Sequence, residues 1–111
     1  TRMPRRAYGI DVCPSDGNLL ASCGRDGNIK VFDKRESKIV KSLEKIHSSM
    51  KFYSLTSKEW IDCVRWSPSG DMLATASGDT TTKLLDFKTG KVLLTGATLD
   101  GGRLLPFLKV N

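Results

Sequence analysis

Two stretches of this 111-residue chain carry nearly the same sequence, and this internal repeat constrains the fold more than any other feature. Residues 8–33 read YGIDVCPSDGNLLASCGRDGNIKVFD, and residues 62–86 read DCVRWSPSGDMLATASGDTTTKLLD. Asp33 matches Asp86 at a separation of 53 residues. A repeat near this length indicates an array of supersecondary units, none of which buries its apolar face alone. The repeat therefore predicts a modular fold that presents a binding surface.

Each copy predicts four short β-strands. Residues 61–66 alternate apolar and polar side chains, which is the period of a half-buried strand. Asp26-Gly27 predicts a tight two-residue hairpin turn, because such a turn needs a positive φ. No segment has helical periodicity, so the chain is predicted to be all-β. The expected strands are residues 8–12, 19–23, 28–32 and 39–43 in the first copy, and 61–66, 72–77, 82–86 and 91–95 in the second.

The repeated segments resemble the signature of WD-repeat β-propellers, with Phe32-Asp33 standing where the family usually has Trp-Asp. The matching segments are residues 19–22, 26–33, 67–70, 73–77 and 85–86. This resemblance implies an all-β fold of two four-stranded antiparallel WD-repeat blades that belong to an incomplete β-propeller. Since a propeller needs at least about four blades, it also implies a fragment of a larger ring, a truncated gene product, or a unit that completes its ring by self-association.

The organisation expected from the repeat has five parts. They are a basic N-terminal lead (1–7), a first blade (8–43), a long inter-blade insertion (44–60), a second blade (61–96) and a non-repeat C-terminal tail (97–111). The insertion carries Phe52 and Tyr53, which are costly to expose. It is either a partner contact or an extra strand or loop that packs locally. Two blades alone leave apolar sheet faces and strand edges exposed, which favours association.

In the WD-repeat family, a blade is often braced by a hydrogen-bonded histidine, hydroxyl, aspartate and tryptophan. The matching positions here are Ser22, Asp26 and Phe32, and then Thr75, Asp79 and Leu85. Phe32 and Leu85 have no N–H to donate, so the resemblance predicts that neither network is complete. Asp26 and Asp79 are expected to satisfy turn amides with their own side chains. His47 is displaced from the family position, because the insertion delays the next strand by about ten residues.

The composition argues against several functional classes. One histidine and three scattered cysteines do not suit a tetrahedral zinc site, so we expect no metal and no cofactor. The repeated Asp, Ser and Thr residues are explained by turns and strands, so we do not expect an enzyme. No apolar run approaches the roughly 20 residues of a membrane helix. Unpaired cysteines indicate an intracellular protein of the cytoplasm, with the nucleus as an alternative.

We expect the chain to be a scaffold or adaptor that binds other proteins. In WD-repeat propellers, one end of the disc gathers side chains from the start of the first strand and from the turn before the third. Arginine, tyrosine and tryptophan dominate the energetics of protein interfaces. Trp60 has an equal alternative, which is to pack beneath its own loop. The predicted contact residues at this end are Arg6, Tyr8 and Arg25 in the first blade, and Trp60 and Asp62 in the second.

A second functional hypothesis starts from the segment Phe32-Asp33-Lys34-Arg35. This segment resembles the tryptophan–aspartate–any–arginine box of WD-repeat substrate receptors for cullin ubiquitin ligases. Arg35 would then form bidentate hydrogen bonds with a partner carboxylate. The alternative is a solvated arginine in a turn.

A third reading starts from the net charge of +6 and the pI of about 9.4, which are compatible with a polyanion or nucleic-acid partner. The residues that would carry such binding are Arg2, Arg5, Arg6 and the group Lys34, Arg35, Lys38 and Lys41. Acidic residues are interleaved with the basic ones along the chain, so a solvated face explains the charge better than nucleic-acid binding does.

Overall fold

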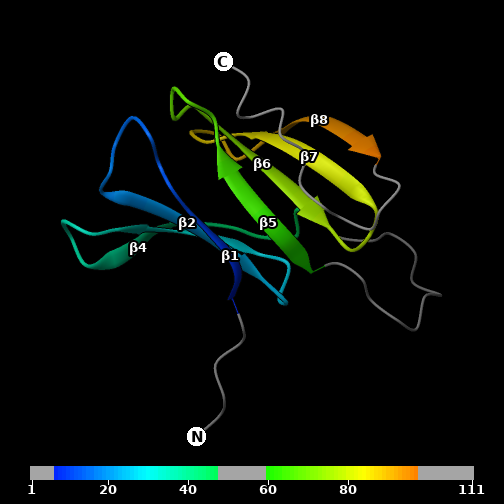
Figure 1. The fold of residues 1–111 in the computed structure, drawn as a ribbon, viewed down its shortest axis with the longest axis horizontal. Helices are drawn as coiled ribbons and strands as arrows, with labels where there is room; N and C mark the ends of the chain where they lie inside the picture. Colours follow the sequence, from blue (N-terminus) through cyan, green and yellow to red (C-terminus); the bar gives the residue numbers. More distant parts are fainter. Residues whose placement is uncertain (1–6, 48–59, 98–111) are drawn as a thin grey trace, which may run out of the picture.

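The computed structural model describes residues 7–47 and 60–97, and these residues form eight β-strands without a helix. The strands make two four-stranded antiparallel sheets, each in simple sequence order (Figure 1). The predicted all-β fold of two blades is confirmed, and every strand begins and ends within two residues of its expected bounds. The first sheet contains β1 (Ala7–Val12), β2 (Leu19–Gly24), β3 (Ile29–Asp33) and β4 (Lys38–Leu43); the second contains β5 (Ile61–Trp66), β6 (Met72–Ser77), β7 (Thr81–Asp86) and β8 (Val92–Ala97).

The two sheets share register as well as topology. Leu20 pairs with Phe32 in the first sheet, and Leu73 pairs with Leu85 in the second. The irregularities are also repeated, since the first strand pair and the last strand pair of each sheet both contain a register shift at matching positions. Both copies therefore build the same sheet, down to the places where the ladder is interrupted.

The sheets pack face to face around one apolar core. Because side chains alternate between the two faces of a strand, each sheet can offer one apolar face to the other. The side chains that meet there include Ala21, Ile29 and Val31 from the first sheet and Val64, Leu73 and Leu85 from the second, all of them fully buried.

Hydrogen bonds and a ring contact also join the two sheets around this core. The carboxylate of Asp11 accepts the backbone N–H of Trp66 at 2.8 Å, and the carbonyl of Asp11 accepts the indole N–H at 3.0 Å. The ammonium of Lys41 donates to the carbonyls of Phe87 at 2.6 Å and Lys88 at 2.8 Å. The rings of Trp66 and Phe87 meet edge to face, 5.0 Å apart. None of these residues has the same type at the equivalent position of the other copy, so these sequence differences contribute to the contact between the sheets.

One predicted turn is wrong in detail. Asp26-Gly27 was expected to form a two-residue hairpin, but β2 ends at Gly24 and β3 begins at Ile29, so four residues connect them. Gly27 does have a positive φ of 77°, and its N–H donates to the carbonyl of Gly24. The carboxylate of Asp26 accepts the N–H of Asn28 at 3.0 Å, which stabilises the longer turn.

Within the described ranges, no helix is long and apolar enough to cross a membrane.

Candidate functional site

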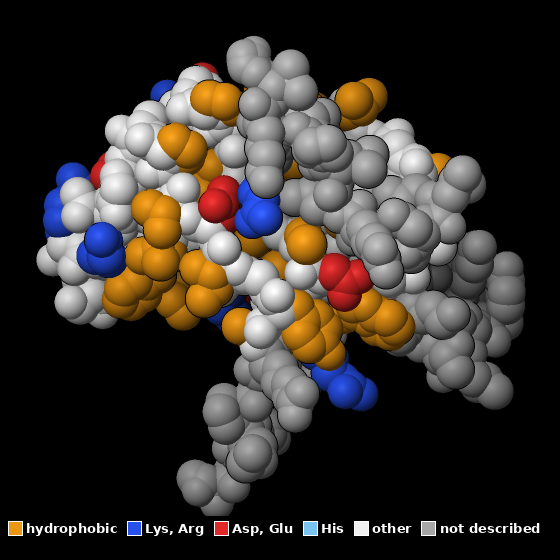
Figure 2. All heavy atoms as spheres, viewed as in Figure 1, with side chains coloured by type: hydrophobic (Ala, Val, Ile, Leu, Met, Phe, Trp, Pro, Cys, Tyr) orange, Lys and Arg blue, Asp and Glu red, His pale blue; other side chains and the backbone are white. Residues whose placement is uncertain are grey.

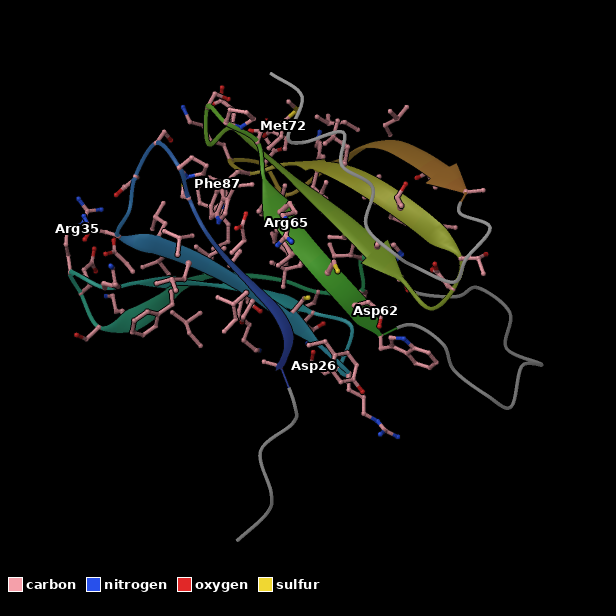
Figure 3. The ribbon with its side chains drawn as sticks, viewed as in Figure 1. Asp26, Arg35, Asp62, Arg65, Met72 and Phe87 are labelled. Carbon is pink, nitrogen blue, oxygen red and sulfur yellow. The ribbon has the colours of Figure 1, made fainter. Side chains whose placement is uncertain are left out.

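Four of the predicted contact residues come together at one end of the molecule. The start of β1 lies beside the turn after β2, because Ala7 pairs with Gly24. The start of β5 lies beside β1, since a Cβ atom on Gly9 would stand 3.2 Å from the carbonyl oxygen of Asp62. Figure 3 shows Asp26 and Asp62 at this same end. We call this the β1/β5 end and define it by Tyr8, Arg25, Trp60 and Asp62.

The exposure of these four side chains differs. Tyr8 is 41% exposed and Arg25 is exposed, whereas Trp60 and Asp62 are half-buried. Trp60 lies against its own sheet: a Cβ atom on Gly78 would overlap the indole ring, and the carbonyl of Trp60 accepts the hydroxyl of Ser77 at 2.7 Å. Trp60 thus packs locally while keeping part of its surface open. Burial raises the pKa of Asp62 above its ordinary value, although a hydrogen bond from Trp60 opposes this.

Arg35 lies far from the β1/β5 end, as its label in Figure 3 shows. Its guanidinium contacts the carboxylates of Asp33 at 3.2 Å and Asp16 at 3.3 Å. The side-chain hydrogen bond from Arg35 is the largest of the effects that lower the pKa of Asp33. Arg35 therefore braces the turns at the end of β3 and is not part of the same surface as Tyr8 and Trp60.

His47 forms a hydrogen-bonded network in the second sheet that was not expected from the sequence. The residue is 1% exposed. Its Nδ1 lies 3.0 Å from the carboxylate of Asp79 and 3.0 Å from the hydroxyl of Thr81, and its Nε2 lies 2.6 Å from the hydroxyl of Thr75. Because a carboxylate only accepts, Nδ1 carries the proton and Nε2 accepts from Thr75. The prediction that His47 is displaced from the network is wrong. The sequence signal for its observed position was the preceding segment Glu44-Lys45-Ile46, which resembles the segment before the family's histidine.

The electrostatics of this network favour a neutral histidine beside an ionised aspartate. Burial lowers the pKa of His47 below its ordinary value; Asp79 opposes this effect, and Lys83 reinforces it. Burial on its own would raise the pKa of Asp79, but the hydroxyl and amide of Thr81, together with His47, hold it below its usual range. Leu85 stands where the family usually has tryptophan, and its apolar side chain is fully buried without an N–H to donate to the network. His47 and Thr75 are buried, whereas Asp79 and Thr81 are half-buried at the edge of the network.

The remaining predicted residues are placed as follows. Asp26 and Asp79 each accept a turn amide, from Asn28 and Thr81 respectively. Arg6, Phe52 and Tyr53 lie outside the described residues. Across residues 7–47 and 60–97, no group of three or more His, Cys, Asp and Glu side chains is arranged to hold a metal ion.

All three cysteines are free, and burial raises the pKa of the Cys23 thiol to about 12, with a smaller effect from Cys63.

The basic group after β3 consists of Lys34, Arg35, Lys38 and Lys41. Lys38 pairs with Glu36 at 3.3 Å, while Arg35 and Lys41 contact the partners given above. Three of the four side chains in that group are therefore already engaged within the chain.

Comparisons with known proteins agree with this architecture. A family model described as "WD domain, G-beta repeat" matches residues 7–33, and one described as "Anaphase-promoting complex subunit 4 WD40 domain" matches residues 47–101. Among curated proteins, the "WD repeat, SAM and U-box domain-containing protein 1" of Homo sapiens is 34% identical over 88 residues, which is 78% of this chain and 17% of that protein.

Two further relatives show the same pattern. The "WD repeat-containing protein AAC3" of Dictyostelium discoideum is 34% identical over 76% of this chain and 15% of its own length. "Pre-mRNA-processing factor 19" of Homo sapiens is 33% identical over 68% of this chain and 13% of its own length. The chain thus spans less than a fifth of the length of each of these relatives.

Proposed function

This chain belongs to the WD-repeat family, and from that premise we propose that it is a non-enzymatic scaffold that binds other proteins through its β1/β5 end. The observation that carries this proposal is the meeting of Tyr8, Arg25, Trp60 and Asp62 at one end of two rigidly packed sheets. A backbone that is already ordered loses little conformational entropy on binding, and Tyr, Trp and Arg are the types that dominate interface energetics. Three free cysteines fit an intracellular setting, in the cytoplasm or the nucleus.

The test uses charge reversal at the two ends of the first sheet. In the longest natural form of the protein, Arg25→Glu at the β1/β5 end is compared with Lys34→Glu, an exposed residue just after β3. Proteins captured by chemical cross-linking are identified for each variant. We expect Arg25→Glu to weaken at least one specific partner by about tenfold or more, while Lys34→Glu retains it. Equal capture by the unaltered protein and by both variants would contradict the proposal.

The other two candidate functions receive less support. A substrate receptor of a cullin ubiquitin ligase would need a free guanidinium at Arg35, but that group is held by Asp33 and Asp16. A polyanion binder would use Lys38 and Lys41 as well, and both are engaged within the chain. Polyanion binding also makes a distinct prediction, because its affinity should fall steeply as the salt concentration rises.

A further inference from the structure

Asp62, at the β1/β5 end, is a half-buried carboxylate that has no cation beside it. Among residues 7–47 and 60–97, no lysine, arginine or histidine forms an ion pair with Asp62. Burial raises the pKa of its carboxyl group, and the hydrogen bond from Trp60 offsets this only in part. Taking a carboxylate out of water without a cation costs free energy, so its surroundings disfavour the charged form of Asp62.

Other carboxylates of the chain that are not fully exposed have strong donors. Asp33 accepts from the guanidinium of Arg35 at 3.2 Å. Asp86 accepts from the amide and from the hydroxyl of Thr89, both at 2.8 Å. These hydrogen bonds lower the pKa of both carboxyl groups. The uncompensated charge of Asp62 is therefore a local feature of the β1/β5 end.

Aromatic side chains accompany Asp62 at this end. The indole of Trp60 donates to Asp62 and lies against Gly78, which fixes the position of the ring. Tyr8 is 41% exposed and precedes Gly9, which packs against the backbone of Asp62. In the view of Figure 3, Figure 2 shows acidic atoms at the surface of this end with hydrophobic side chains beside them. The face of an aromatic ring attracts cations, as a carboxylate does.

A second carboxylate, from the first sheet, adds to the negative charge here. Figure 3 shows Asp26 and Asp62 at the same end. Both raise the pKa of the Cys23 thiol, in addition to burial and to Cys63, so the two carboxylates act on one small region. Arg25 contributes one positive charge. Two carboxylates against one guanidinium leave the region negative, which favours a cationic partner group.

We propose that the β1/β5 end binds an arginine side chain of a partner protein, with the guanidinium paired to the Asp62 carboxylate beside the rings of Tyr8 and Trp60. A carboxylate accepts several hydrogen bonds, so acceptor positions remain besides the one that Trp60 uses. A guanidinium forms two parallel hydrogen bonds with a carboxylate and stacks on aromatic rings, which a lysine ammonium does not. This inference rests on the proposed function, because it names the chemistry by which the same end recognises a partner.

The test uses a blocked tripeptide, acetyl-Gly-Arg-Gly-amide, as the probe and the longest natural form of the protein. Binding is followed by the NMR signal of the Trp60 indole N–H, which is assigned by its loss in Trp60→Phe. We expect a saturable shift with the arginine peptide and none with acetyl-Gly-Glu-Gly-amide at the same ionic strength. A shift with neither peptide would overturn the inference. A shift only with the glutamate peptide would also overturn it, but would leave the protein-binding function in place.

Matched variants test the role of the charge. Asp62→Asn keeps an acceptor for the Trp60 indole and should weaken the arginine peptide by about tenfold. Asp71→Asn, at an exposed carboxylate before β6, should leave the affinity unchanged. Equal affinities in the two variants would overturn the assignment. Because burial disfavours the charged form of Asp62, Asp62→Asn should not lower the temperature of unfolding; a lower temperature would assign the charge to the fold instead.

An arginine of the chain itself is the remaining alternative to a partner. Arg6 directly precedes β1 in the sequence and lies outside the described residues. Arg6→Gln should leave the affinity for the arginine peptide unchanged. Binding that occurs only in Arg6→Gln would show that Arg6 fills the site, and it would overturn the assigned partner.

Discussion

The two sheets are built alike, but they are covered differently. Phe32 and Leu85 occupy the same register position, yet Phe32 is 37% exposed and Leu85 is fully buried. The backbone pattern is the same on both sides, so the difference comes from what packs on each face. The repeat therefore specifies the strand geometry. How much a side chain contributes to the free energy of unfolding depends on the residues that cover it.

The second lesson comes from the residues that break the repeat. Trp66 stands where the first copy has Val12, and it makes two hydrogen bonds with Asp11. Lys41 stands where the second copy has Leu94, and it reaches the turn after β7. Some departures from the repeat thus lie at contacts between the sheets, which makes this contact a specific one.

The largest effect is expected where the sheets interlock. Trp66→Ala removes a buried indole and should lower the free energy of unfolding by about 4 kcal/mol. Val12→Ala, at the matching exposed position, should cost less than about 1 kcal/mol. Urea unfolding followed by circular dichroism measures both. Because Trp66→Ala could unfold the chain, Trp66→Phe provides a milder variant, with an expected loss of about 1–2 kcal/mol for the indole donor. Similar losses for Trp66→Ala and Val12→Ala would remove the proposed difference between the faces.

The next effect concerns the histidine network. His47→Ala leaves the Thr75 hydroxyl and part of the Asp79 carboxylate without their partner, and should destabilise the chain by about 3 kcal/mol. Ser22→Ala, at the position of the first sheet that matches Thr75, should change stability by less than about 1 kcal/mol. The same unfolding experiment checks both variants. A loss below about 1 kcal/mol for His47→Ala would show that the network contributes little.

A smaller effect is expected at the turn between the second and third strands, which has the same conformation in both sheets. Gly27 and Thr80 are equivalent residues with φ values of 77° and 71°. A β-branched residue is strained at positive φ, whereas glycine is not. Thr80→Gly should therefore stabilise the chain by about 0.5–1 kcal/mol, and Gly27→Thr should destabilise it by about 1–2 kcal/mol. Thermal unfolding of both variants gives the measurement, and changes of the same sign would refute the explanation.

The smallest effect is the pH dependence of the second sheet. The folded-state pKa of His47 is lowered, so below an unfolded pKa of about 6.5 the unfolded chain binds a proton that the folded chain does not. Stability should therefore decrease as the pH falls from about 7 through 6. The lowered pKa of Asp79 adds to this loss only near pH 4 and below. Urea midpoints measured across this range should fall for the natural chain and stay level for His47→Ala. An equal slope in both chains would assign the dependence to other groups.

Much of the fold and part of the site were predictable from local patterns. Strand positions followed from alternation and from the turn residues, because these depend on neighbours within a few positions. The placement of Tyr8 and Trp60 at the same end of the molecule was implied by the resemblance to WD-repeat propellers. One expectation failed, because His47 was judged by its distance along the chain. Arg35 as a partner contact stays a prediction, and the motif that suggested it does not reveal the nearby Asp16.

The amino-acid sequence by itself determined the positions of the strands and the equivalence of the two halves, because both depend on short-range periodicity and on turn chemistry. The tertiary structure alone decided which of two matching faces became a core, that Arg35 was tied to acidic neighbours, and that His47 was buried against Thr75 and Asp79. Those outcomes depend on contacts between residues about 20 to 55 positions apart. The free energy of burying a side chain depends on the surface that covers it, and a local pattern does not contain that surface.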